Sequence, residues 1–269
     1  MYLEFYGLKE PPFNITPDPR FIYFSPEHQT AYDHLMYGVA HRKGFIALVG
    51  EVGAGKTTLC RSVLASLPMT VQTALVLNPA ITANQLLRAI LQDFGIEPRG
   101  RDRLNHISQL NNFLLDQMAE GNNVVLIIDE AQDLTPQVLE EVRLLNNLET
   151  DQYKLLQIIL SGQPELQKRL NRQDLRQLKQ RIMVRCELNL LKDQDIGPYV
   201  HHRLKVAGGE GRVQFDSSAL KLVHRASDGT PRKINTICDN ALLAGYVASQ
   251  KTIRAREVKK ALKNLGDLL

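Results

Sequence analysis

The feature that most constrains the fold is a glycine-rich stretch that begins at Gly50. Residues 50–57 read Gly-Glu-Val-Gly-Ala-Gly-Lys-Thr; they follow the apolar run 45–49 and precede a run with helical character, 58–67. A buried strand, a glycine-rich turn and the start of a helix are the context in which this spacing binds phosphate. Glycines let successive backbone N–H groups point inward at a helix start, where an anion is stabilised. The stretch therefore predicts a nucleoside triphosphate site in an α/β fold.

Two side chains of this stretch have specific chemical roles. Lys56 can reach the β- and γ-phosphates as a point charge, and the Thr57 hydroxyl can bind Mg²⁺. The residues predicted to contact the nucleotide are Gly50, Glu51, Val52, Gly53, Ala54, Gly55, Lys56, Thr57 and Thr58.

Apolar runs alternate with helical runs over most of the chain. The apolar runs are 45–49, 72–77, 124–128, 155–160 and 183–188, and helical runs between them include 83–94, 104–119 and 135–148. Continuous apolar runs are typical of a parallel sheet that is covered on both faces. We therefore predict a doubly wound, five-stranded parallel sheet of the α/β class, with the last run near its edge.

The pattern changes near Leu191 and again toward the N-terminus. After Asp193 we find only helical runs, at 193–207, 216–227, 231–249 and 255–264. The first 25 residues are rich in proline and aromatic residues, which excludes a long helix and favours an ordered arm, followed by a helix from Pro26 to Gly38. We predict an N-terminal arm and helix that pack on the core (1–44), an α/β domain (45–191) and a smaller all-α lid domain (192–269).

Two acidic residues, Asp129 and Glu130, end the apolar run 124–128. An acid at this position holds Mg²⁺ in proteins that bind nucleotides through a loop of this kind. The carboxylate beside it can take a proton from the attacking water as a general base. We therefore predict Asp129 as a metal ligand together with Thr57, and Glu130 as the catalytic base.

Polar residues near the ends of later runs supply further candidates. Gln163, and Ser161 as a second choice, can hydrogen-bond the attacking water or the γ-phosphate; a simple turn before the helix 164–170 is an equal alternative. Arg232 opens a helical run in the sequence Gly-Thr-Pro-Arg-Lys and can reach back to the γ-phosphate. Five arginines precede or lie in the fifth apolar run, and one of them can act as an arginine finger while the others form a solvated face. They are Arg169, Arg172, Arg176, Arg181 and Arg185.

Composition bounds the remaining possibilities. The 269 residues are 43% hydrophobic and 23% charged, as in a globular protein with a sizeable core. The net charge of +4 leaves nucleic acid, anionic lipid or an acidic partner open and selects none of them. Three widely separated cysteines favour reduced thiols in a cytosolic protein. No run reaches the length of about 18 apolar residues that a spanning helix needs, so we expect no membrane span.

His28, His34 and His41 are near one another in sequence. No carboxylate or thiol completes a metal-binding set with them, so we predict that they are polar positions on a surface helix.

The order of these motifs resembles that of the AAA+ ATPases, with a helical lid that carries Gly-Thr-Pro-Arg. Several segments resemble more closely the ExeA/GspA-type ATPases of bacterial type II secretion and mannose-sensitive pilus systems. These segments are 6–8 (Tyr-Gly-Leu), 12–13 (Pro-Phe), 16–21 (Thr-Pro-Asp-Pro-Arg-Phe), 129–132 (Asp-Glu-Ala-Gln) and 162–166 (Gly-Gln-Pro-Glu-Leu).

The resemblance implies an ATPase that uses ATP and Mg²⁺ to drive assembly of a secretion or pilus system. It implies the arginine-finger position for Arg181 and the sensor-2 position for Arg232. It also implies a homo-oligomer, as a ring or filament, that works in the cytoplasm at the inner face of the inner membrane through an inner-membrane assembly protein. ExeA-type proteins continue into a transmembrane helix, so a chain that ends at Leu269 is expected to be a short pilus-type relative or a cytoplasmic piece.

Two further interpretations stay open beside the assembly ATPase. Transposition regulators of the same AAA+ branch share much of the pattern, so an ATP-dependent, DNA-associated regulator is the second interpretation. A helicase would need a second sheet domain, and no long Lys/Arg run or aromatic–basic interleaving favours nucleic acid. A nucleotide-gated interaction module that barely hydrolyses ATP is the third, and the intact Glu130 argues against it.

Overall fold

The computed structural model describes residues 1–77, 80–150 and 154–266. The chain divides into two compact units, which we describe separately. The sheet unit consists of Gln29–Gly50 and Val63–Leu188, and the helical unit consists of Met1–His28, Glu51–Ser62 and Asn189–Leu269. This division follows contacts, whereas the limits at residues 44 and 191 follow the sequence pattern and stay predictions.

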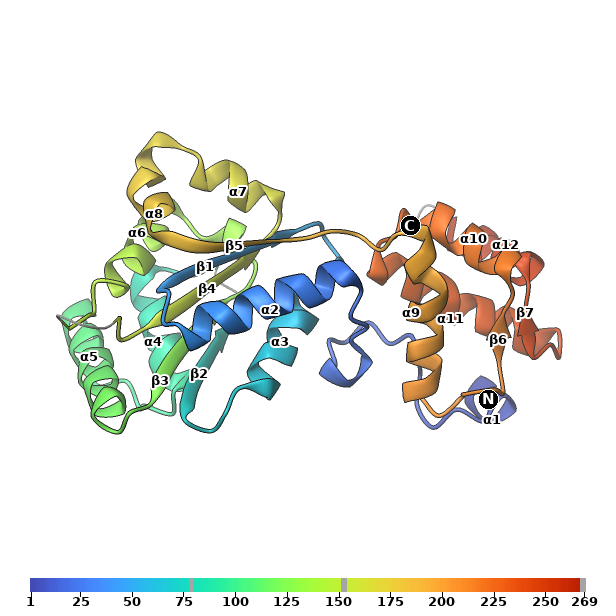
Figure 1. Cartoon of the computed structure of the whole chain (residues 1–269), viewed down its shortest axis with the longest axis horizontal. Coiled ribbons are helices and arrows are strands. Elements are labelled where there is room, and N and C mark those ends of the chain that lie inside the picture. Colours follow the sequence, from blue (N-terminus) through green and yellow to red (C-terminus); the bar gives the residue numbers. More distant parts are fainter. Residues whose placement is uncertain (78–79, 151–153, 267–269) are drawn as a thin grey trace. The chain divides into compact units, whose positions relative to one another are not determined.

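Five parallel strands form the centre of the sheet unit, in the order β2-β3-β4-β1-β5 (Figure 1). They are β1 (Phe45–Gly50), β2 (Val71–Val76), β3 (Asn123–Ile128), β4 (Gln157–Gly162) and β5 (Ile182–Leu188). The order places β4 beside the strand that leads into the glycine-rich loop, and it confirms that β5 is an edge strand. The predicted fold class is confirmed.

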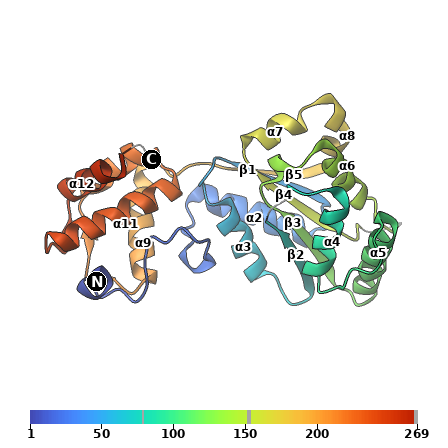
Figure 2. The ribbon, with the colours of Figure 1, turned by 180° about the vertical axis from the view of Figure 1, so that it is seen from behind.

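Helices cover both faces of this sheet, which explains why its strands are apolar throughout. They are α2 (Pro26–Ala40), α3 (Lys56–Ser66), α4 (Ala83–Asp93), α5 (Arg103–Ala119), α6 (Pro136–Leu145), α7 (Pro164–Leu170) and α8 (Arg176–Arg181), with the short 3-10 turns η2 (Ala131–Asp133) and η3 (Gln173–Leu175). Alternate residues of β3, such as Leu126, lie in one core with the buried residues of α4, α5 and α6. On the other face α2 approaches closely, since a Cβ on Gly38 would lie 2.4 Å from Cδ1 of Ile46. Figure 2 shows the same unit from behind.

The helical unit is built around a second core. Its elements are α1 (Tyr2–Tyr6), η1 (Pro19–Phe21), α9 (Asp193–Val206), β6 (Gln214–Phe215), α10 (Ser217–Ser227), α11 (Pro231–Val247), β7 (Thr252–Ile253) and α12 (Ala255–Leu265). We predicted helices alone after residue 192, and the structure adds a parallel pair of two-residue strands, β6 and β7. Such short pairing leaves only a faint pattern in sequence.

The N-terminal arm belongs to the core of the helical unit. Tyr6 and Phe13 are buried there with residues of α9 and α11. The Tyr6 hydroxyl donates to the Leu242 carbonyl at 3.0 Å, and Arg203 donates through Nε to the Pro12 carbonyl at 2.6 Å. We expected the arm on the α/β domain; its buried aromatic side chains pack with the helices of the lid.

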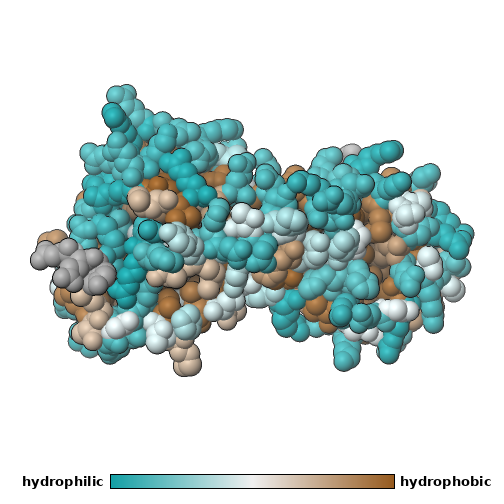
Figure 3. Space-filling view, in the orientation of Figure 1, coloured by the Kyte–Doolittle hydropathy of each residue, from teal (hydrophilic) through white to brown (hydrophobic). Residues whose placement is uncertain are grey.

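Hydrophilic side chains predominate on the face that Figure 3 shows, with apolar residues scattered among them. This is ordinary for a protein surface. Among the described residues, none of the helices combines the length and the apolar character that crossing a bilayer requires.

Candidate nucleotide site

The glycine-rich loop has the backbone of an anion-binding turn. Gly53 and Gly55 have φ angles of 77° and 103°, which only glycine adopts without strain. The Ala54 N–H closes a turn by donating to the Glu51 carbonyl at 3.2 Å. Helix α3 begins directly afterward at Lys56, so the loop lies at the N-terminus of an 11-residue helix. The predicted strand, loop and helix are therefore all present.

Lys56 is folded into this loop. Its side chain is buried, with 5% of the residue exposed, and Nζ donates to the Glu51 carbonyl at 3.0 Å. The ammonium group thus lies against the loop backbone at the start of α3, and a helix N-terminus stabilises an anion. A phosphate would bring this cation a stronger partner than a neutral carbonyl, because charge-assisted pairs are roughly twice as strong.

Gly50 is fixed by the neighbouring strand. A Cβ at this position would lie 2.6 Å from the Leu188 carbonyl oxygen of β5. That distance is too short for any side chain, so the first glycine of the motif is required where β1 and β5 end together.

Arg232 lies against the loop, at the start of α11. Its N–H donates to the Gly53 carbonyl at 3.3 Å, and a Cβ on Gly53 would lie 2.9 Å from the Arg232 Cβ. The Arg232 side chain itself is exposed. The structure therefore brings the candidate sensor residue to the loop from a position almost 180 residues later in the chain.

A polar cluster lies at the carboxyl edge of the sheet unit, where β3 and β4 end side by side. Asp129 follows β3 and is 2% exposed. Its Oδ1 accepts from the Ser161 hydroxyl at 2.6 Å and from the Glu130 N–H at 3.1 Å. β4 runs two residues further than we predicted, so Ser161 and Gly162 belong to the strand rather than to a turn after it. The role of Ser161 in this geometry is to hold Asp129.

Glu130 is held more unusually. Its φ angle is 51°, a left-handed conformation that is rare for a residue with a side chain. Two side-chain amides donate to its Oε2, from Gln132 Nε2 at 2.8 Å and from Gln163 Nε2 at 3.1 Å. Gln163 and Gln132 are also joined to each other, because the Gln163 N–H donates to Gln132 Oε1 at 3.0 Å. The cluster fixes the direction of one carboxylate.

Such a cluster suits general-base chemistry. Backbone strain at a functional site persists only when the surroundings determine it, and the two amides do so here. A carboxylate with a fixed orientation can accept a proton from a water that is positioned beside it. We predicted that Gln163 would contact the attacking water or the γ-phosphate; in this structure its amide donates to Glu130.

Arg181 lies at the amino ends of the strands, at the opposite end of the sheet from the Glu130 cluster. It is the last residue of α8, and the next residue, Ile182, pairs with Phe45 at the first position of β1. Its Nη1 donates to Asn147 Oδ1. Gly50 is the last residue of β1. The structure therefore separates Arg181 from the edge of the sheet at which Gly50, Asp129 and Glu130 lie.

The other candidate arginines differ among themselves. Arg172 pairs with Asp174 at 3.0 Å on the surface, and Arg185 donates weakly to the Lys179 carbonyl at 3.4 Å. Arg169 departs from the expected solvated face, since it donates to the Gln132 carbonyl. It thus supports the turn that carries the Glu130 cluster.

His28 is a residue that the sequence analysis misjudged. We predicted a surface position, but His28 is 4% exposed and its Nε2 lies 3.2 Å from the Ala54 carbonyl oxygen of the loop. A usable signal was present, because His28 has the helical spacing of the buried residues Ala31, Leu35 and Val39. Gln132 was likewise missed as a partner of Glu130, although it is only two residues away and the left-handed turn at Glu130 separates them.

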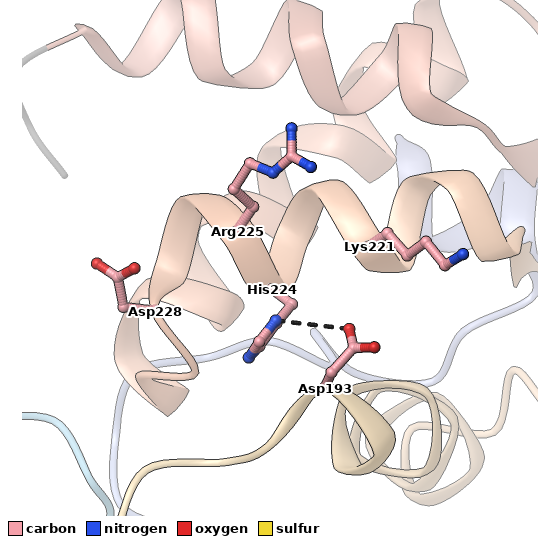
Figure 4. A pocket seen from close by; sticks show the side chains of 5 residues that line it. All are labelled: Asp193, Lys221, His224, Arg225 and Asp228. Carbon is pink, nitrogen blue, oxygen red and sulfur yellow. Dashed lines mark ion pairs between the residues drawn. The ribbon is translucent and has the colours of Figure 1, made fainter.

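The helical unit also has a shallow pocket at its surface, between the start of α9 and α10. It is lined by Asp193, Lys221, His224, Arg225 and Asp228 (Figure 4). His224 Nδ1 lies 3.5 Å from Asp193 Oδ1, whereas Lys221 and Arg225 point away from that pair. Its polar groups therefore do not converge on one ligand position.

Comparisons with known proteins agree with this geometry. Residues 39–170 match the AAA domain family. The chain is 47% identical, over 255 residues, to general secretion pathway protein A of Aeromonas hydrophila; the match covers 94% of this chain and 46% of that relative. The chain thus spans about half the length of the curated relative that it matches.

Solved structures with the same fold are far more distant in sequence. Cdc6p of Pyrobaculum aerophilum superposes with a TM-score of 0.73 at 17% identity, covering 94% of this chain and 70% of that one. ORC2 of Aeropyrum pernix gives 0.70 at 16% identity, covering 95% and 71%. Together with the loop and the AAA domain match, the 47% identity makes this chain similar to the AAA+ ATPases of the ExeA/GspA type.

Proposed function

We propose that this protein is a Mg²⁺-dependent enzyme that hydrolyses ATP to ADP and phosphate, and that it uses this reaction to drive assembly of a bacterial secretion or pilus system. The observation that carries the proposal is the Glu130 carboxylate, which two amides hold at the end of β3. A protein that only bound nucleotide would have no need for a strained, oriented carboxylate in this position.

The residues present fit a bound triphosphate. The loop 50–58 offers N–H groups at a helix start, and Lys56 adds a cation. Thr57 and Asp129 provide hydroxyl and carboxylate oxygens, the ligand types that Mg²⁺ prefers. Bound Mg²⁺ would neutralise charge on the phosphates. Glu130 would accept the proton of the attacking water, and Arg232 would respond to the γ-phosphate.

The biological role rests on the relative. The Aeromonas protein is named for the general secretion pathway, and this chain matches about half of its length. We propose that this chain acts in the cytoplasm as a homo-oligomer, in a ring or filament, and reaches the inner face of the inner membrane through an inner-membrane secretion or pilus assembly protein. The three cysteines are free and buried, which suits a reducing compartment.

Steady-state phosphate release with and without Mg²⁺, together with genetic complementation, tests this proposal. Wild type should release phosphate and restore secretion or piliation in a deletion strain, and Glu130→Gln should do neither. Arg172→Ala is the matched control, because it removes only a surface ion pair. Restored secretion by Glu130→Gln would show that hydrolysis does not drive the process.

A basic face on α12 favours a second candidate, an ATP-dependent regulator that associates with DNA. Six exposed basic side chains lie in 251–266, two before α12 and four along it, and the sole acid of this stretch, Glu257, is buried and pairs with Arg256 at 2.5 Å. They are Lys251, Arg254, Arg256, Lys259, Lys260 and Lys263. The apolar stripe of α12, Val258, Ala261 and Leu265, is buried in the core of the helical unit. The exposed face is therefore left to bind phosphates electrostatically, without base recognition.

Anisotropy of a labelled DNA duplex across salt concentrations tests this candidate. Binding through this face should weaken with a log–log slope of about −0.9 for each phosphate contacted. Joint replacement of Lys259, Lys260 and Lys263 by glutamate should abolish it, while Lys168→Glu on α7, also exposed, should not. Absence of binding at low salt would exclude the DNA role.

A further inference from the structure

We propose that His28 positions the phosphate loop: by holding the Ala54 carbonyl outward, it directs the Gly55 N–H toward a bound phosphate. The proposal rests on nucleotide binding by this loop, and it concerns a residue that comes from the first turn of α2 rather than from the motif itself.

The contacts of His28 lie within the helical unit. Its Nε2 lies 3.2 Å from the Ala54 carbonyl oxygen, and its Nδ1 lies 2.8 Å from the Ser25 hydroxyl oxygen. Both His28 and Ser25 are almost fully buried. The ring also borders the next residue of the loop, because a Cβ on Gly55 would lie 3.6 Å from Nε2. The imidazole therefore supports the loop from outside at the Ala54–Gly55 peptide.

The hydrogen-bond partners define the form of the ring. A carbonyl oxygen can only accept, so Nε2 must carry the hydrogen; Nδ1 then accepts from the Ser25 hydroxyl in the neutral imidazole. Burial lowers the pKa of His28 and so favours this neutral form. The His28 N–H also donates to Ser25 Oγ at 3.3 Å, which fixes the serine on the same turn. One tautomer thus satisfies every polar atom of the pair.

Peptide geometry turns this contact into an effect on the anion site. In a trans peptide unit the C=O of one residue and the N–H of the next point in opposite directions. Holding the Ala54 oxygen against His28 therefore directs the Gly55 N–H away from His28. Gly55, with a φ of 103°, gives that peptide unusual freedom to rotate. The hydrogen bond from His28 to the Ala54 carbonyl restricts this rotation. A loop without this anchor would have to order this N–H during binding.

The anchor lies beside charged groups at the start of α9. Ser25 Oγ approaches Glu27 Oε2 only to 3.5 Å, because its one hydrogen goes to His28 Nδ1, and Glu27 instead pairs with Lys192 at 2.5 Å. Asp195, on the first turn of α9, accepts from the Lys192 N–H at 3.1 Å. The charged groups that face His28 from the adjoining elements are thus Glu27, Lys192 and Asp195. Glu27 and Lys192 neutralise each other, which leaves His28 to act through its hydrogen bonds.

The test compares affinities for a fluorescent ATP analogue and for the matching fluorescent adenosine, which lacks phosphates. Wild type must bind the ATP analogue and Lys56→Ala must lose it; failure here would refute the proposed function rather than this inference. His28→Leu should weaken binding of the ATP analogue roughly 10- to 100-fold, the range for one hydrogen bond to a charged group. Adenosine affinity should stay within about twofold.

Three further variants separate positioning from folding. His28→Gln keeps an N–H donor and should recover most of the ATP affinity, whereas His34→Leu, an exposed histidine on the same helix, should behave as wild type. Ser25→Ala leaves the ring in place without its orienting partner and should give a smaller loss, so it decides the matter if His28→Leu does not fold. Unchanged ATP affinity in folded His28→Leu or Ser25→Ala, or equal losses for ATP and adenosine, would overturn the proposal.

Discussion

Removal of the Arg181 guanidinium should abolish turnover and leave nucleotide binding intact. Arg181 precedes β5 and lies beside Phe45, at the amino end of β1. The five residue steps from Phe45 to Gly50 span about 16 Å at the usual rise of a strand. An extended arginine side chain reaches roughly 7 Å from its Cα, by ordinary bond lengths. Arg181 therefore cannot reach the phosphate loop that follows its own Gly50, and we expect it to act on the site of a neighbouring subunit.

The expected magnitude is large. Arginine fingers that a partner supplies are worth about 10³–10⁵ in rate. Arg181→Ala should thus reduce phosphate release per subunit by that factor at every protein concentration, with unchanged affinity for a fluorescent ATP analogue. Its free energy of unfolding should change by no more than about 1 kcal/mol, since within 1–77, 80–150 and 154–266 the side chain makes one hydrogen bond, to Asn147, near the surface. Arg172→Ala is the matched control.

Mixing two inactive variants gives the decisive assay. A Lys56→Ala subunit has a defective loop and an intact Arg181, and an Arg181→Ala subunit has the reverse. If the finger acts between subunits, the mixture should regain phosphate release that neither variant has alone. Absence of recovery, while mixed oligomers are seen by mass photometry or crosslinking, would refute the reasoning. Arg176 and Arg185 would then be the next candidates.

Four other predictions follow from the contacts. Lys56→Ala should lose binding of a fluorescent ATP analogue, because the loop loses its buried cation; retained wild-type affinity would contradict this. Glu130→Gln should still bind ATP yet hydrolyse it about two to four decades more slowly, and unchanged phosphate release would remove Glu130 from the mechanism. Arg203→Met should lower the free energy of unfolding in urea by about 2–4 kcal/mol, since it leaves the carbonyls of Pro12 and Asn14 without the Arg203 donor. A loss under 1 kcal/mol would contradict this stabilising role of Arg203. Burial lowers the pKa of His28 below the usual 6.5, so its contribution to stability should be complete above pH 6.5 and should fall as the pH drops below 6.5. The difference in free energy of unfolding between wild type and His28→Gln should therefore shrink on acidification.

Local sequence predicted the chemical motifs because each depends on neighbours in the chain. The glycine spacing after Val49 fixes the loop, and the acids after Ile128 mark the end of a buried strand. The fold class was accessible for the same reason, since apolar runs that alternate with helices admit few topologies. The end of β4 was not, because pairing with β1 rather than apolarity decides that Ser161 lies within the strand.

The remaining site residues depend on contacts between distant segments. Gln163 becomes a partner of Glu130 only when β3 and β4 end side by side, whereas Gln132 is two residues from Glu130 and reaches it within one turn. His28 reaches the loop across 26 residues, and polarity alone made a surface position the natural expectation. A histidine in register with an apolar stripe is the one sequence sign that argued otherwise.

The loop is held by two donors that both lie outside the motif. His28 holds the Ala54 carbonyl from the first turn of α2, which follows the arm, and the Arg232 N–H holds the adjacent Gly53 carbonyl from the first turn of α11. Residues 51–62 accordingly cluster with the arm and the lid helices. A change in this loop when the γ-phosphate is lost would therefore act first on the arm and on α11, whose buried side chains share one core with α12. If hydrolysis drives assembly as we propose, the helical unit is the place to seek a partner surface that responds to the nucleotide.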